Sequence, residues 1–174
     1  MEEYQVVLKL AAYLLEYPDE VWRKDFSEYR AVVDEIKMPQ VKEVFTDLFS
    51  YVEKIGVKEY ETQYVQSFDF SQNTNLYLST HNRTDFGKQS QEMHEYKNLF
   101  LENGFDLQNE LPDYLPAILE LVAAVPKQNA KKILVKIKSK LELLRDRFIE
   151  AKLAHAFLMD AILIQAENLN SEVS

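Results

Sequence analysis

Cysteine is absent from the 174-residue sequence, and glycine and proline are scarce, with 3 and 5 residues. The lack of cysteine excludes disulfides, thiolate metal sites, iron–sulfur ligation and cysteine nucleophiles. So little glycine and proline argues against an all-β fold, which needs both at its many turns. Gly56, Gly87 and Gly104 also stand too far apart to form a glycine-rich phosphate loop.

Long apolar runs are missing as well. No run approaches the ~20 residues that a membrane helix requires. The start, Met1-Glu2-Glu3, lacks the basic region of a signal peptide. We therefore expect a cytoplasmic protein without stable membrane insertion. The net charge of −9 argues against a nucleic-acid partner.

Apolar residues recur at helical spacing along almost the whole chain, and 47% of the residues are hydrophobic. This pattern predicts an all-α, single-domain helical bundle over residues 1–167, with residues 168–174 as a mobile tail. Pro18, Pro39 and Gly56 are expected at helix boundaries. Further helices are expected over 57–70 and 111–125. The apolar pattern from Ala130 to Ile162 is long for one helix, so we expect a bend or turn near 145–150, or else one long helix.

Catalytic motifs are not found. His81, His94 and His155 are scattered and form no HExxH pattern, and no GxSxG element marks a nucleophile. We therefore expect no enzyme, with no catalytic residues, no metal and no cofactor. The alternative is a hydrolase whose metal centre is assembled from distant histidines and carboxylates.

Aromatic residues and charge favour binding. Ten tyrosines and ten phenylalanines are present, densely placed between Tyr51 and Tyr114. Tyrosine suits a groove that holds a peptide, although an aromatic core with surface hydroxyls explains the same composition. Residues 127–152 contain nine basic and three acidic residues, so this segment carries +6 and the remaining chain −15. The acidic part could bind a basic peptide, and the basic segment could contact cofactor phosphates or be solvated helix surface.

Three segments carry a more specific pattern. The first reads Leu14-Leu15-Glu16-Tyr17-Pro18. The second runs from Tyr64 to Ser71 (YVQSFDFS) and on through Thr74–His81 (TNLYLSTH), and the third is Glu110–Pro116 (ELPDYLP) before an apolar helix. In this order and spacing they resemble the NarJ family, the nitrate reductase delta subunit or molybdenum cofactor assembly chaperone, which is grouped with the TorD and DmsD chaperones. The resemblance extends from about Leu8 to Val125.

This resemblance implies a non-catalytic helical chaperone, monomeric or weakly dimeric. Its implied partner is the catalytic (alpha) subunit of respiratory nitrate reductase, including that subunit's N-terminal peptide. The chaperone would keep this subunit competent for molybdenum cofactor insertion before membrane assembly. The wider family has Asp-His where this chain has Asp113-Tyr114, which weakens any transfer of nucleotide binding. The alternative is a maturation chaperone for another molybdoenzyme, with direct cofactor or nucleotide contact.

The expected partner-binding site is a tyrosine-lined cleft edged by carboxylates. Tyr64 and Phe68 lie four residues apart and should share a helix face. Asp113 could contact the partner or cap the following helix, and Asp69 has the same two interpretations. The predicted site residues are Tyr64, Phe68, Asp69, Leu76, Tyr77, His81, Asp113 and Tyr114.

Overall fold

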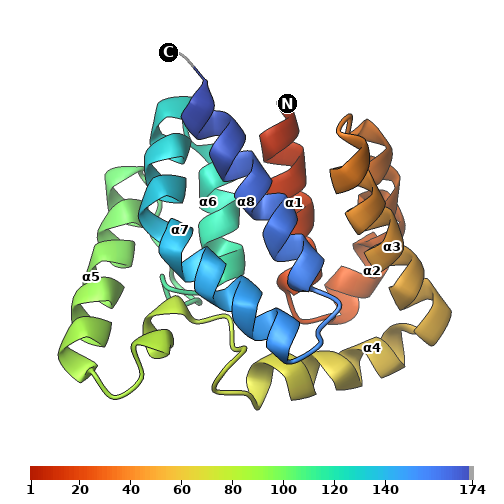
Figure 1. Ribbon diagram of the computed structural model, residues 1–174, viewed down its shortest axis with the longest axis horizontal. Helices are drawn as coiled ribbons and strands as arrows, with labels where there is room; N and C mark the ends of the chain where they lie inside the picture. Colours follow the sequence, from red (N-terminus) through yellow and green to blue (C-terminus); the bar gives the residue numbers. More distant parts are fainter. Residues whose placement is uncertain (173–174) are drawn as a thin grey trace.

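The computed structural model describes residues 1–172 and confirms the predicted all-α bundle (Figure 1). Three short turns accompany the α-helices: the 3₁₀ turns η1 (Val33–Glu35) and η3 (Leu78–Asn82) and the π turn η2 (Val65–Asp69). The α-helices are α1 (Glu3–Leu15), α2 (Glu20–Val32), α3 (Pro39–Ile55), α4 (Val57–Tyr64), α5 (Phe86–Glu102), α6 (Leu115–Ala124), α7 (Lys127–Glu150) and α8 (Ala156–Ser171).

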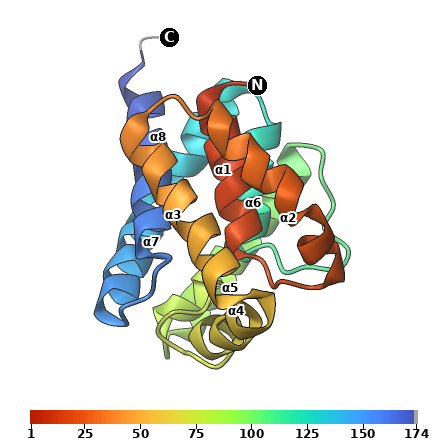
Figure 2. The same ribbon diagram turned by 90° about the vertical axis from the view of Figure 1, so that its right-hand side faces the viewer.

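Helix α1 lies at the centre of the bundle, where α2, α6 and α8 pack against it (Figures 1 and 2). Leu8, Leu10 and Ala12 are fully buried, and the side chain of Leu10 lies on the opposite side of this helix from the other two. A helix that is apolar around most of its circumference is stable only inside a protein, so α1 needs neighbours on most sides, and only the side of Lys9 faces solvent. Truncating one such leucine to alanine typically costs about 2–5 kcal/mol.

Several helix boundaries follow local signals in the sequence. The side chain of Asp19 accepts a hydrogen bond from the Trp22 N–H (2.9 Å) and caps α2. Pro39 occupies the first turn of α3, where its missing N–H costs nothing. Gly56 separates α3 from α4 with a φ of 86°, a left-handed value that glycine adopts without steric cost. These boundaries agree with the predicted ones.

The long apolar pattern near the C-terminus is divided into two helices. The structure therefore agrees with the predicted turn and not with the alternative of one long helix. α7 ends at Glu150, and α8 begins at Ala156 after a turn in which Lys152 has a φ of 59°. The two helices pack against each other, because the turn reverses the chain and brings their apolar faces together.

Two predicted ranges need correction. Residues 111–114 form a turn rather than the first turn of a helix, so α6 begins only at Leu115. At the C-terminus, α8 continues through Ser171 and buries Leu169, so helical structure extends past the predicted boundary at 167. Residues 173–174 of the predicted tail lie outside the described residues. Between residues 1 and 172, each helix is too short or too polar to cross a bilayer.

Candidate functional site

The second and third motif segments meet through their backbones. The N–H of Leu78 donates to the carbonyl of Asp113 (2.9 Å), and the N–H of Leu115 donates to the carbonyl of Leu76 (2.8 Å). These two bonds pair Tyr77 with Tyr114 as an isolated antiparallel β-bridge. Segments more than 30 residues apart in the sequence therefore form one local structure.

Asp113 is fully buried beneath this bridge. Its Oδ2 accepts hydrogen bonds from the Ser79 N–H (3.2 Å) and hydroxyl (2.6 Å), while Oδ1 has no partner. Burial raises the pKa of this carboxyl, although the bonds from Ser79 oppose the shift. Neither prediction for Asp113 holds in this conformation, because the side chain neither caps α6 nor reaches the surface.

A partly buried ion pair between Lys140 and Glu92 holds the loop that contains Leu78. The ammonium of Lys140 on α7 donates to the Leu78 carbonyl (3.0 Å) and to Glu92 Oε2 on α5 (3.0 Å). Asn82 also donates to Glu92 Oε2 (2.8 Å). Each of the two charged groups makes two hydrogen bonds, which offset the cost of removing the charges from water. The 3₁₀ turn η3 is thereby held against α5 and α7.

His81 is buried in the same loop and not available at the surface. Its Nδ1 accepts a hydrogen bond from Arg147, so the proton of the neutral ring lies on Nε2, which donates to the Asn75 carbonyl (2.9 Å). Burial, with the Arg147 charge as a smaller cause, lowers the pKa of His81 to about 4. The role of His81 is to fasten the loop to α7.

Tyr64, Phe68 and Leu76 are also buried, with 2–3% of each residue exposed. The rings of Tyr64 and Phe68 are in contact (centroids 4.8 Å apart), as their spacing predicted. The Tyr64 hydroxyl donates to the Leu15 carbonyl (2.6 Å) at the end of α1. Five of the eight predicted residues, including Asp113 and His81, are therefore sealed inside. In this conformation they support a surface and cannot line a cleft.

Three predicted residues do reach the surface: Asp69 is exposed, and Tyr77 and Tyr114 are half-buried. The rings of Tyr77 and Tyr114 lie 5.0 Å apart across the β-bridge. The Tyr114 hydroxyl is 3.3 Å from that of Tyr64, and the exposed Tyr17 packs edge-on against the Tyr64 ring at 5.8 Å. Tyrosines from all three motif segments are thus contiguous.

Carboxylates surround these tyrosines. Glu16 lies against Glu120, and its burial, together with the neighbouring charge, raises the pKa of Glu16 to about 8. Glu110 accepts a hydrogen bond from the Tyr77 hydroxyl (3.5 Å). The negative charge of Asp69 also acts on Tyr17 and Tyr77. We call this surface the acidic tyrosine face; it consists of Glu16, Tyr17, Asp69, Tyr77, Glu110, Tyr114 and Glu120.

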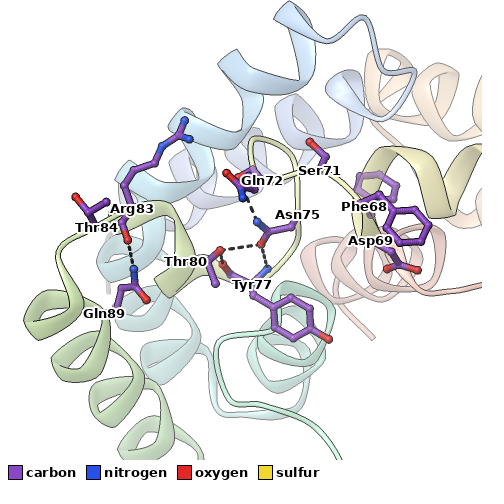
Figure 3. A pocket seen from close by; sticks show the side chains of 11 residues that line it. Phe68, Asp69, Ser71, Gln72, Asn75, Tyr77, Thr80, Arg83, Thr84 and Gln89 are labelled. Atoms are coloured by element: carbon purple, nitrogen blue, oxygen red, sulfur yellow. Dashed lines mark hydrogen bonds between the residues drawn. The ribbon is translucent and has the colours of Figure 1, made fainter.

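A hollow of about 680 Å³ adjoins the acidic tyrosine face (Figure 3). Asp69 and Tyr77 belong to both, while Arg83 lies toward the far side of the hollow. Asn75 orders the loop between them, because its side-chain oxygen accepts hydrogen bonds from the Tyr77 N–H and the Thr80 hydroxyl, both 2.9 Å long. Phe70 lines the hollow with 83% of its surface exposed, so a large apolar ring is available beside the carboxylate of Asp69.

The sequence-based site omitted Glu16, Tyr17, Phe70, Glu110 and Glu120. Four of these five residues lie within the three motif segments. The spacing of residues within those segments does not show which side chains are exposed and which are buried. Glu120 lies on the helix that follows the third segment, and only the packing of α1 on α6 places it beside Glu16.

The sequence also suggested two alternative sites, a metal centre and a cofactor-binding basic segment, which can be compared with the structure of residues 1–172. Among residues 1–172, no three histidine, aspartate or glutamate side chains come together as a metal site requires. Much of the basic charge of residues 127–152 is engaged within the protein. Lys127 pairs with Glu2 and Glu172, Lys136 with Glu95, and Arg145 with Asp160. This pairing reduces the charge available for cofactor phosphates.

Comparison with known families agrees with the motif segments. The model of the nitrate reductase delta subunit family matches residues 34–157, and the chain therefore belongs to this family. The resemblance inferred from the three segments is confirmed.

Individual relatives are similar over nearly the whole chain. The probable nitrate reductase molybdenum cofactor assembly chaperone NarJ of Bacillus subtilis is 30% identical over 166 residues, covering 95% of this chain and 90% of the relative. The corresponding Escherichia coli K12 proteins NarJ and NarW are 27% and 26% identical, covering 91% and 95% of this chain and 68% and 71% of the relatives. These names describe assembly chaperones and no catalyst, in agreement with the prediction that the chain is not an enzyme.

Proposed function

We propose that this protein is an assembly chaperone for a nitrate reductase. It binds the catalytic subunit, including the N-terminal segment, and keeps that subunit competent for molybdenum cofactor insertion before membrane assembly. Family membership and the names of the relatives support the client class. The observation that carries the proposal of a binding surface is the β-bridge, which joins two motif segments beneath one acidic, aromatic surface.

The motif residues divide into two roles in this proposal. Asp69, Tyr77 and Tyr114 contact the client, together with the exposed ring of Phe70. The buried motif residues, such as Asp113, hold the loop in the conformation that presents these groups. The division accounts for the presence of both buried and exposed residues in the same short segments.

The chemistry of the surface suits a basic amphipathic segment. Phe70 and the tyrosine rings provide apolar contact area with few rotatable bonds, and the tyrosine hydroxyls offer hydrogen bonds. The charges of Glu110 and Asp69 complement lysine or arginine side chains around the contact. The acidic balance of the chain outside residues 127–152 attracts such a segment as it approaches.

Titration calorimetry with the N-terminal peptide of the cognate catalytic subunit tests this proposal. Phe70→Ser should weaken peptide binding by about tenfold or more, as the loss of an aromatic anchor residue commonly does. Asp69→Asn should weaken peptide binding by only a few-fold, because the carboxylate is solvent-exposed. The same change should reduce the salt dependence of peptide binding, because one charge is removed from the contact. Both residues are exposed, so neither change should alter the thermal midpoint of the protein by more than a degree or two.

The matched control is Phe157→Ser, which removes an exposed phenylalanine from α8, outside the acidic tyrosine face and the hollow. Peptide binding should be unchanged in this variant. Equal weakening by Phe70→Ser and Phe157→Ser, or no detectable peptide binding by the wild-type protein at high micromolar concentration, would refute the proposed surface.

A further inference from the structure

One asparagine of the chain is followed directly by glycine, at Asn103-Gly104. In this dipeptide the backbone nitrogen of the glycine can attack the side-chain carboxamide of the asparagine, because glycine has no Cβ that obstructs the approach. Every other asparagine of the sequence precedes a residue that has a side chain. Asn103-Gly104 is therefore the position most susceptible to deamidation, the conversion of asparagine to aspartate or isoaspartate.

The attacking nitrogen belongs to the turn that ends α5. Asn103 follows the last residue of this helix, and Gly104 has a φ of 82°. The N–H of Gly104 donates to the Leu101 carbonyl (3.1 Å). The N–H of Phe105 donates to the Phe100 carbonyl (2.9 Å). These two bonds form a Schellman motif, so the nucleophile of the reaction is engaged in a hydrogen bond in the folded chain.

The carboxamide of Asn103 is held as well. Its Nδ2 donates to the Leu99 carbonyl (2.7 Å), and its Oδ1 accepts a hydrogen bond from Nδ2 of Asn129 (3.0 Å). Leu99 lies on α5 and Asn129 near the start of α7, two helices that are neighbours in Figure 1. The half-buried side chain therefore joins the end of one helix to the start of another. Ring closure on Gly104 requires the release of both the carboxamide and the Schellman motif.

We propose that Asn103 is a site of spontaneous deamidation and that opening of this helix end limits the rate. Once the hydrogen bonds open, the nitrogen of Gly104 forms a bond to Cγ of Asn103 and gives its proton to solvent. The side-chain nitrogen takes up a proton and leaves as ammonia. Water then opens the cyclic succinimide at either carbonyl and yields aspartate or isoaspartate. The reaction consumes one water molecule, releases one ammonia molecule and needs no oxidant or cofactor.

The products change the contacts at the end of α5. A carboxylate at position 103 cannot donate to the Leu99 carbonyl, and its charge lies at the negative end of the helix dipole. It still accepts the hydrogen bond from Asn129. Isoaspartate also lengthens the backbone by one methylene group, which disrupts the closely spaced bonds of the Schellman motif. Deamidation should therefore loosen the end of α5, and this proposal does not depend on the function proposed above.

Mass spectrometry of the full-length protein tests the proposal. The protein is incubated in mildly alkaline buffer, with and without denaturant, and is then digested with trypsin. Digestion gives the peptide 98–127, which contains Asn103 together with Asn98 and Asn109 as internal controls. In the folded protein, deamidation should be faster at Asn103 than at either control. In denaturant it should accelerate by about tenfold or more, because the helix end is no longer closed.

Two variants examine the two groups that react. Asn129→Ala removes the hydrogen bond to Oδ1 of Asn103 and leaves the Asn-Gly pair intact, so deamidation of the folded protein should be several-fold faster. The matched control, Asn168→Ala, removes an exposed asparagine of α8 and should leave the rate unchanged. Gly104→Ala should slow the reaction several-fold in denaturant, where the added Cβ obstructs the nitrogen and the strain of a positive φ is absent.

Three results would overturn the proposal. Equal rates at Asn103 with and without denaturant mean that the helix end does not control the reaction. An Asn103 that stays unmodified in the folded protein while Asn109 reacts removes the site itself. In Asn129→Ala, an unchanged rate at Asn103, or equal acceleration at Asn98 and Asn103 through general unfolding, contradicts the assigned hold of Asn129 on the carboxamide.

Discussion

Replacing Glu16 with glutamine should stabilise the fold, and by more at pH 8 than at pH 5. Glu16 follows the last residue of α1, partly buried against Glu120, and this environment raises its pKa from 4.5 to about 8. A carboxyl whose pKa is raised by folding favours the folded state only while it is protonated. Its contribution to stability is therefore lost as the pH rises from about 4.5 to 8.

The magnitude follows from the pKa shift. Each pH unit within this window costs about 1.4 kcal/mol of unfolding free energy, so between pH 5 and pH 8 the wild-type protein loses about 3 kcal/mol through Glu16. Glutamine has the same shape and no charge to bury, so Glu16→Gln should avoid this loss. The stability difference between variant and wild type should grow by about 3 kcal/mol across the window.

Denaturant titrations at pH 5, 6.5 and 8 measure this difference. Trp22 is the only tryptophan, is 3% exposed and stacks on Tyr13 at 4.6 Å, so its fluorescence reports global unfolding. Glu59→Gln, on the exposed surface of α4, is the control for removal of one charge. A stability difference that stays constant from pH 5 to pH 8 would show that Glu16 is not confined against Glu120.

Three further changes examine the buried supports. Asp113→Ala should lower the unfolding free energy by about 2–3 kcal/mol, measured by denaturant titration, because Ser79 loses two hydrogen bonds in a buried site; an unchanged midpoint would contradict the assigned contact. Tyr60→Phe should cost about 1–2 kcal/mol in the same assay, since the hydroxyl serves both the Leu14 carbonyl (2.9 Å) and His155 Nε2 (2.8 Å); a neutral or stabilising result would refute this. Burial lowers the pKa of His155 to about 4, so the stability from its neutral ring is complete above pH 6.5 and is lost as the pH falls toward 4. His155→Gln should therefore reduce the acid-induced loss by about 3 kcal/mol between pH 7 and pH 4, and parallel stability curves for variant and wild type would exclude a buried neutral ring.

The helical architecture could be predicted from the sequence because helix formation is governed by nearby residues. Apolar spacing identified the buried faces, and Pro39 and Gly56 marked helix ends through their own backbone preferences. The division of the C-terminal pattern was predicted within a few residues, since its length exceeds that of ordinary globular helices.

The candidate site was less predictable because its contacts join distant parts of the chain. The position of Asp113 before a helix suggested a cap, but Ser79, 34 residues away, supplies its hydrogen bonds instead. The motif residues could be selected by resemblance, whereas their division into buried and exposed sets depends on the β-bridge between Tyr77 and Tyr114. Local pattern alone gives no information about such a pairing.

The fastening of the loop at residues 75–82 has a consequence for how the protein matures. Its backbone is paired by residues 113–115, its Leu78 carbonyl is held by Lys140, and His81 is held by Arg147. All of these groups are synthesised after the loop itself. A nascent or truncated chain that ends before residue 140 lacks both Lys140 and Arg147, so the loop that supports the acidic tyrosine face is fastened to α7 only after most of the chain has been synthesised.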